Sequence, residues 1–268
     1  MLKKLFKSTL FMLAPTTAIQ LSAARARRHA QMLESNWGLV DETHNFVGKF
    51  GNAVCYGPFS GMTYPPRSLD RHVTDKLLGT YEMELHPFLE EAIKAGPEQV
   101  IDIGSAEGYY AVGMARRLPD ATIVAFDADS WARERTAEMA QVNGNTNLHT
   151  RGLCTEQWLV DNVRDKTLVI MDCEGCEAGL TAFVPSCRSH LLSWWLIELH
   201  ETQVPGVTRT ILQRFNRTHH TELCTSRIRK REDLPVFLNS EMDFPVLKWM
   251  DEHRDPGQQW LLCRPRAS

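Results

Sequence analysis

The sequence lacks several features that define specialised protein classes. Its seven cysteines are an odd number scattered over 268 residues, which does not fit a disulfide framework and favours a reducing compartment. The N-terminal apolar run over residues 10–14 is far too short to span a bilayer. The net charge of −3 provides no overall positive field for nucleic acid. We therefore expect no nucleic-acid partner, and we interpret the run from Arg227 to Arg231 as an exposed edge strand and its loop.

Acidic residues are also missing from residues 1–33, whose apolar positions recur at helical spacing. The pattern predicts a basic amphipathic helix over residues 1–35, interrupted at Pro15. Two roles fit this helix: packing on the domain, or peripheral membrane contact through residues 1–14. A cleaved signal peptide is a third interpretation, but it conflicts with the cytoplasmic location expected for the cofactor inferred below.

The remaining chain divides into a cap over residues 36–96 and a larger domain over residues 97–268. Glycines and aromatic residues in 36–66 predict short strands and turns, and 69–95 is expected to be helical. The larger domain alternates short apolar segments with amphipathic ones. Strands are expected at 100–104, 122–127, 147–151, 167–172, 193–199, 221–226 and 259–264, and helices at 108–118, 130–142, 155–162, 176–184 and 207–217. This alternation predicts an α/β fold, a doubly wound, Rossmann-like, mostly parallel seven-stranded sheet with helices on both faces.

A glycine-rich turn follows the first of these strands. Gly104 and Gly108 allow a sharp turn and a close approach of the backbone to a ligand. Asp127 ends the next strand, about 20 residues farther on, where a carboxylate that binds both ribose hydroxyls is expected. The pocket therefore suits a nucleoside, and we expect its cofactor contacts from Asp102, Gly104, Ser105, Ala106, Glu107, Gly108, Tyr109, Asp127 and Ala128, together with Asp172, Tyr81 and Glu82.

The spacing of the loop separates two classes of cofactor. A nicotinamide or flavin dinucleotide needs glycines at relative positions 1, 3 and 6, which here are Gly104, Ala106 and Tyr109. The tyrosine would block the close helix-to-strand contact, and no lysine or arginine lies between Asp102 and Tyr110 to hold phosphate. S-adenosylmethionine is therefore favoured over NAD. A noncatalytic scaffold domain remains an alternative from another class.

Two later strands end in unusually polar segments. Asp172 and Glu174 follow the strand predicted at 167–172, and Glu198 and His200 end the strand predicted at 193–199. Period-two geometry places Glu198 and His200 on one face of their strand, so they and Asp172 are expected to share one cavity. They are the candidate catalytic residues, with His200 as a general base, or the ligands of a divalent cation. A helix N-cap for Asp172 and Glu174, and ordinary packing for His200, are the structural alternatives.

The segment from Met171 to Glu177 and the later Glu198-Leu199-His200 resemble the Asp-x-Glu-Gly-x-Glu signature and the Glu-Leu-His strand of FkbM-type methyltransferases. The resemblance spans roughly residues 78–264. It implies a seven-stranded Rossmann-like fold and O-methylation of hydroxyls on sugars, polyketides and related metabolites. It also implies cofactor contacts by Asp102, Gly104, Gly108 and Asp127, and active-site positions for Asp172, Glu174, Glu198 and His200.

The sequence thus predicts a methyltransferase that uses S-adenosylmethionine, with a small-molecule or glycan hydroxyl as the acceptor. Tyr81, Glu82, Tyr109 and Tyr110 are candidates to line the cofactor or acceptor cavity, although packing explains each equally well. Cys173 and Cys176 invite a zinc or redox interpretation, but no second such pair accompanies them. The pattern leaves the oligomeric state open.

Overall fold

The computed structural model describes residues 28, 31, 32, 34, 36–186, 192–235, 245–254 and 257–266. The helix expected over residues 1–35 lies largely outside the described residues, and the membrane contact through residues 1–14 lies entirely outside them. Among the helices that are described, none is long and apolar enough to cross a membrane.

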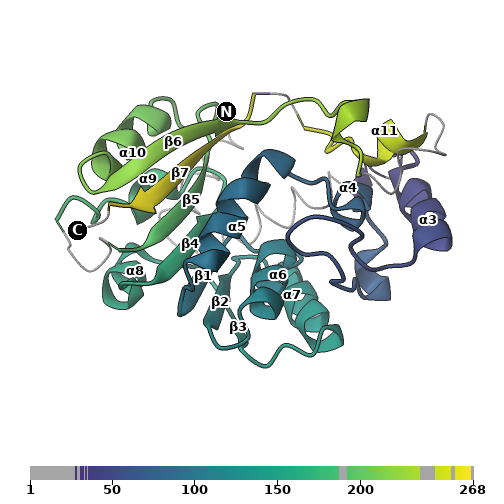
Figure 1. Ribbon diagram of the computed structural model, residues 1–268, viewed down its shortest axis with the longest axis horizontal. Helices are drawn as coiled ribbons and strands as arrows, with labels where there is room; N and C mark the ends of the chain where they lie inside the picture. The colour runs from purple at the N-terminus through teal and green to yellow at the C-terminus, as the bar shows by residue number, and fades with distance from the viewer. Residues whose placement is uncertain are drawn as a thin grey trace, which may run out of the picture.

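One seven-stranded sheet organises the chain (Figure 1). Its strand order is β3-β2-β1-β4-β5-β7-β6. The strands are β1 (Gln99–Ile103), β2 (Thr122–Phe126), β3 (Leu148–Arg151), β4 (Thr167–Met171), β5 (Trp194–Leu199), β6 (His219–Thr225) and β7 (Gln259–Pro265). Neighbouring strands are parallel except that β7 is antiparallel to both β5 and β6. The predicted fold class is confirmed.

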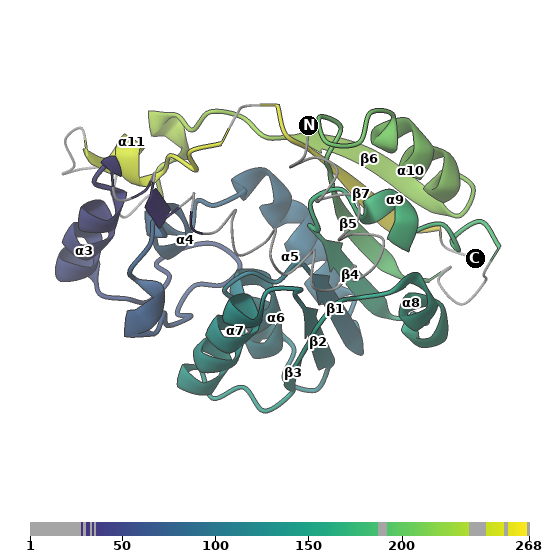
Figure 2. The same cartoon turned by 180° about the vertical axis from the view of Figure 1, so that it is seen from behind.

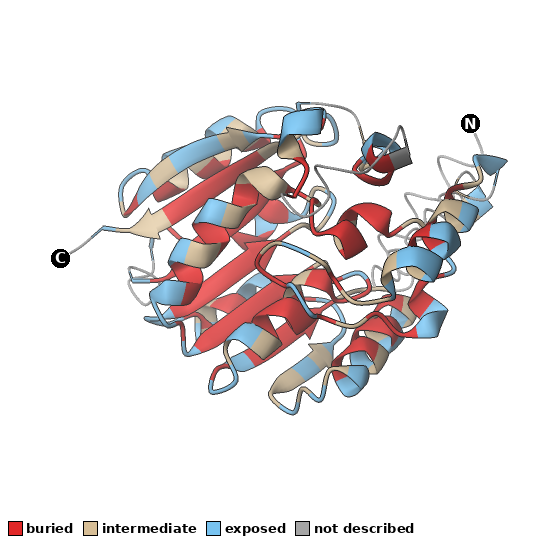
Figure 3. Cartoon of the chain, turned by 45° about the vertical axis from the view of Figure 1, so that its right-hand side comes forward, coloured by how far each residue is buried: buried red, intermediate tan, exposed pale blue. Residues whose placement is uncertain are grey.

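Helices cover both faces of the sheet, because alternate residues of each buried strand point in opposite directions. Val100 of β1 packs in a core with α5 (His86–Lys94), α6 (Tyr109–Arg117) and α7 (Ser130–Val142). Ile101 packs in a second core with α8 (Glu156–Asn162), α9 (Glu177–Leu180) and α10 (Val207–Phe215), the helices that come forward in Figure 2. The central strands are buried along their length, whereas β3 and β6 alternate between covered and exposed positions (Figure 3).

The cap differs from its sequence prediction. Residues 36–66 do not form several strands, since α3 (Leu39–Phe50) occupies the first part and an isolated bridge joins Ala53 to Thr63. The helix expected over 69–95 is broken into α4 (Thr74–Leu78), η2 (Met83–Leu85) and α5. The first break follows from Gly79, which ends α4 in the left-handed conformation at φ 83°; a residue with a side chain would not fit there, because its Cβ would lie 2.0 Å from the carbonyl oxygen of Tyr56.

The remaining short elements complete the cap side of the molecule. They are η1 (Pro66–Ser68), η3 (Arg231–Asp233) and α11 (Pro245–Trp249), and α11 lies beside α3 and α4 in both ribbon views. The helix expected over 176–184 is only one turn long, α9. The basic run that follows the edge strand β6 is exposed as expected at Arg227, Lys230 and Arg231, but not at Arg229, whose guanidinium is buried against Glu84, 2.5 Å away, and Glu252.

The strand order places a switch point between β1 and β4, from which the chain continues to β2 on one side and β5 on the other. In open parallel sheets, ligands bind beyond the carboxyl ends of the strands at such a point. Gly104 follows β1 there and Asp172 follows β4, and the amide of Asp172 donates to the carbonyl of Ile103 at 2.9 Å. The fold therefore brings together the two segments that the sequence singled out.

Candidate active site

The loop after β1 has the shape of a ligand-binding turn. Gly104 has φ 90°, and a Cβ on it would lie only 1.6 Å from the carbonyl oxygen of Asp172. Gly108, at φ 99°, is the N-cap of α6, and its Cβ would lie 3.1 Å from Thr136 on α7. Both positions need glycine for two reasons, since the left-handed conformation and the close approach each disfavour a side chain. The turn leads directly into the N-terminus of α6.

Asp127 stands beside this loop at the end of β2. One carboxylate oxygen accepts a hydrogen bond from the amide of Ala106 at 3.0 Å, and the other accepts from the amide of Asp129 at 2.8 Å. Each oxygen keeps a further lone pair, so the side chain is held in place and can still accept two hydroxyl groups. Burial raises the pKa of Asp127 to about 6, which keeps it mostly ionised at neutral pH.

The other predicted cofactor residues divide into buried and accessible ones. Asp102 is buried, and burial together with the charges of Asp172 and Asp127 raises its pKa to about 8. Ser105 lies against Thr136, with their hydroxyl oxygens 3.4 Å apart. Glu107 points to the cap, where its carboxylate is 2.5 Å from the Lys76 ammonium. Ala128 is partly exposed, and its carbonyl accepts from Arg133 at 3.0 Å.

A small hollow of about 70 Å³ lies where the cap meets the loop. It is lined by Ser68, Arg71, His72, Val73, Lys76, Glu107 and Trp131. The residues come from the cap, from the loop after β1 and from α7, so the cap closes over the same loop that Gly104 and Gly108 shape.

His200 follows β5 and is the centre of the polar cluster. Its side chain is almost completely buried, and its Nδ1 lies 2.8 Å from Oε1 of Glu177. That oxygen also accepts from the amides of Cys173, at 3.3 Å, and Gly175, at 3.1 Å. An ionised carboxylate can only accept, so Nδ1 carries the hydrogen and Nε2 is left to face the cluster. Glu177 was not assigned a role from the sequence, although it is the third acid of the motif.

Four carboxylates surround His200. Its Nε2 is 3.5 Å from Asp172 Oδ1, 3.5 Å from Glu174 Oε2 and 3.9 Å from Glu198 Oε2. Burial alone would lower the pKa of His200, but the hydrogen bond to Glu177 and the neighbouring charges raise it above its ordinary value. The predicted residues Asp172, Glu198 and His200 thus lie together, with Glu174 closer to the imidazole than Glu198.

Glu198 belongs equally to a second buried network. Its Oε1 is 3.7 Å from the Arg254 guanidinium, which also pairs with Glu82 at 2.8 Å and with Glu252 at 3.2 Å. Burial and the Asp172 charge raise the pKa of Glu198 well above that of an ordinary carboxyl. Arg254 and Glu252, which come from the segment between β6 and β7, were missed because no local pattern marks them.

The predicted cavity-lining residues adjoin this network. The Tyr81 hydroxyl accepts from Arg254 at 2.7 Å, and the Tyr110 hydroxyl donates to Glu82. Tyr109 is buried and packs edge-to-face against Tyr81, with ring centroids 5.4 Å apart. Packing therefore accounts for Tyr109 in this structure, whereas Tyr81 and Glu82 hold the arginine beside Glu198.

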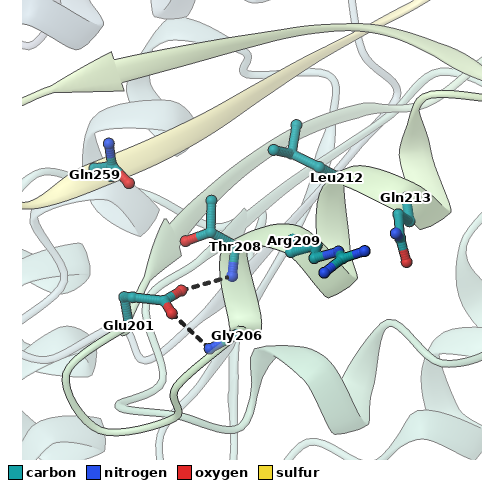
Figure 4. A pocket seen from close by; sticks show the side chains of 7 residues that line it. All are labelled: Glu201, Gly206, Thr208, Arg209, Leu212, Gln213 and Gln259. Atoms are coloured by element: carbon teal, nitrogen blue, oxygen red, sulfur yellow. Dashed lines mark hydrogen bonds between the residues drawn. The ribbon is translucent and has the colours of Figure 1, made fainter.

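A separate open pocket of about 430 Å³ lies at the N-terminus of α10 (Figure 4). Its acid, Glu201, accepts from the amides of Gly206 at 2.5 Å and Thr208 at 3.0 Å. This carboxylate therefore caps the start of the helix. The pocket contains none of the predicted site residues, being lined by Glu201, Gly206, Thr208, Arg209, Leu212, Gln213 and Gln259.

No model of a known protein family and no curated protein matches the chain. Among solved structures, it is similar to a putative O-methyltransferase from Klebsiella pneumoniae, with 11% identity and a TM-score of 0.48 over 90% of this chain and 99% of that one. It is also similar to an O-methyltransferase of tomaymycin synthesis from Streptomyces achromogenes, solved with S-adenosylmethionine, with 10% identity and a TM-score of 0.46 over 90% and 98%. An rRNA methylase from Streptococcus thermophilus has 10% identity and a TM-score of 0.47 over 68% and 97%. Similarity at this level leaves the function to be argued from the site itself.

Proposed function

We propose that the protein is an O-methyltransferase of the FkbM type, which transfers a methyl group from S-adenosylmethionine to a hydroxyl of a small metabolite or glycan. The observation that carries the proposal is the position of Asp127. Two backbone amides hold its carboxylate beside the Gly104–Gly108 turn, and each oxygen retains capacity for a ribose hydroxyl.

The charge of the site favours this cofactor over a dinucleotide. Burial, and then the nearby charges of Asp172 and Asp127, raise the pKa of Asp102, and no lysine or arginine stands within the loop over residues 102–110. A pyrophosphate would meet like charge at this place, whereas a sulfonium cation would meet opposite charge. The same reasoning makes an NAD-dependent oxidoreductase the weaker alternative.

The residues after β4 and β5 supply the acceptor side of the reaction. Asp172 touches the cofactor turn through its backbone and faces His200 Nε2 through its side chain. A hydroxyl held there would lie beside both the cofactor and a group that takes up its proton. Orientation of the two reactants supplies about 7–11 kcal/mol of the barrier reduction, and proton removal adds a factor of about 100 or more. The acceptor class follows from the FkbM resemblance, and the absence of a nucleic-acid partner stays a prediction.

Calorimetric titration with S-adenosylhomocysteine tests the cofactor assignment. We expect Asp127→Ala to weaken binding by at least about tenfold, because two charge-assisted hydrogen bonds are lost. The matched control is Asp120→Ala, which removes an exposed acid next to the start of β2. Equal affinity in the folded Asp127→Ala protein and the wild type, or tighter binding of NAD than of S-adenosylhomocysteine, would reject the assignment.

Turnover tests the acceptor side. We expect His200→Ala to lower formation of S-adenosylhomocysteine at least about 100-fold while its affinity for S-adenosylhomocysteine changes only a few-fold, because the imidazole acts on the acceptor and not on the sulfonium. A noncatalytic scaffold predicts no product with any hydroxyl acceptor, in the wild type as in the variant. A His200→Ala enzyme with undiminished turnover would remove His200 from the mechanism.

A further inference from the structure

We propose that Asp172, Glu174 and His200 form a binding site for a divalent cation of the Mn²⁺ or Zn²⁺ class, at the carboxyl ends of β4 and β5. The cation site stands on its own contacts, and its role in catalysis rests on the proposed methyl transfer. The site replaces Glu198, expected from the sequence as a ligand, with Glu174.

The ligand atoms are already spaced for a cation. One oxygen from Asp172, one from Glu174 and one imidazole nitrogen all lie within 4.8 Å of one another. The two distances from His200 Nε2, 3.5 Å to Asp172 and 3.5 Å to Glu174, are close to the separation of neighbouring ligands around a cation bonded at about 2.0–2.2 Å. Small side-chain movements would bring all three into coordination.

Only one nitrogen of the His200 imidazole, Nε2, is available to bind a metal ion. His200 is 4% exposed, and its Nδ1 is fixed by the carboxylate of Glu177. Its Nε2 points into the cluster, where the described residues offer it no hydrogen bond. A carboxylate that accepts from one imidazole nitrogen while the other binds a metal is the usual support of a metal-binding histidine, since it fixes the tautomer and the ring orientation.

The local charge also calls for a cation. Asp172 and Glu174 both face Nε2, and Asp172 Oδ1 is buried with no hydrogen-bond partner among the described residues. The Arg254 guanidinium, 3.7 Å from the neighbouring Glu198, already pairs with Glu82 and Glu252. Like charges gathered this closely are normally neutralised by protons or by a bound cation.

Such a cation would contribute directly to methyl transfer. Three protein ligands leave coordination positions for the acceptor. With Nε2 bound to the cation, the cation would take over from His200 the activation of the hydroxyl: it would stabilise the alkoxide, and the proton released would pass to solvent. An acceptor that offers two neighbouring oxygens, as in a vicinal diol, would fill two of these positions. The proposed substrate class is therefore a polyhydroxylated acceptor, such as a glycan, that binds through the metal.

Binding of Mn²⁺ to chelator-treated full-length protein tests the site without cofactor or acceptor. We expect electron paramagnetic resonance to show one bound Mn²⁺ per chain. Affinity should fall at least about tenfold in Glu174→Gln and His200→Ala, and about 10- to 100-fold in Glu177→Ala, which removes only the support of the imidazole. Glu134→Gln is the matched control, because Glu134 is an exposed acid on α7.

Two results would overturn the proposal. One is absence of bound Mn²⁺, and of bound Zn²⁺ by calorimetry, in the wild type. The other is a loss of metal affinity in Glu198→Gln as large as in Glu174→Gln, which would show that the ligand set is wrong. S-adenosylhomocysteine affinity, measured in the presence of chelator, tests the cofactor site without the metal. The metal ligands lie outside the contacts of Asp127, so the cation site can be rejected while the cofactor assignment holds, and the reverse.

Discussion

Replacement of Gly104 by alanine is the sharpest structural perturbation of the cofactor loop. Alanine at φ 90° costs about 1–2 kcal/mol from its left-handed conformation alone. Its Cβ would also lie 1.6 Å from the Asp172 carbonyl oxygen, so the turn after β1 or the end of β4 must move. Forced movement of a packed backbone costs about 1–3 kcal/mol more. We therefore expect Gly104→Ala to lower the free energy of unfolding by about 2–5 kcal/mol.

Gly144→Ala separates the two costs. Gly144 also has a positive φ, 69°, but a Cβ there would meet no atom within 4 Å. Gly144→Ala should therefore lose only the stability that the left-handed conformation costs. Urea unfolding of both variants measures the difference, and calorimetry with S-adenosylhomocysteine measures the damage to the loop. The steric reasoning is refuted if the two variants lose equal stability and Gly104→Ala binds S-adenosylhomocysteine as tightly as the wild type.

Two further predictions concern protonation. Burial raises the pKa of Asp127 to about 6, and its proposed role, accepting both ribose hydroxyls, needs the ionised carboxylate. S-adenosylhomocysteine affinity should therefore fall as the pH drops through 6, and a flat profile from pH 7.5 to 5 would contradict the proposed role. Asp102 has a folded-state pKa of about 8 against about 3.8 when unfolded, so the folded state keeps a proton that the unfolded state loses. Its contribution to stability therefore declines by about 1.4 kcal/mol per pH unit as the pH rises between these values. Asp102→Asn removes this loss, and thermal unfolding should show a larger gain over the wild type at pH 8 than at pH 5.

The sequence was sufficient for the elements of the sheet and for the placement of the two polar strand ends. Apolar runs of five or six residues between amphipathic segments located β1, β2, β4 and β5 to within one residue at each end. The glycine spacing located the turn, and the period of two along β5 predicted that Glu198 and His200 share a face. These inferences succeeded because they depend on local periodicity and on steric rules that act within a few residues.

Local periodicity and steric rules did not predict the structure of the cap and its contacts correctly. The sequence 69–95 contains enough helix-forming residues for one helix, but α4 ends at Gly79, which adopts a left-handed conformation packed against the backbone of Tyr56. Likewise, Arg229 appeared as part of an exposed basic run, yet its partners Glu84 and Glu252 make it a buried cation. In both cases a contact between distant segments overrides the local preference.

The composition of the site shows the same division. The sequence alone predicted that Asp127, Asp172 and His200 lie at one edge of the sheet, because each follows an apolar strand and the carboxyl ends of parallel strands share one edge. Only the tertiary structure shows that Glu177 fixes the imidazole of His200. It also shows that the carboxylate of Glu174 lies nearer to Nε2 than that of Glu198 does. It also brought Arg254 to Glu198 from the segment before β7. Hydrogen bonds and ion pairs act over about 3–4 Å in space, and the number of residues between two positions in the sequence does not predict whether they come that close.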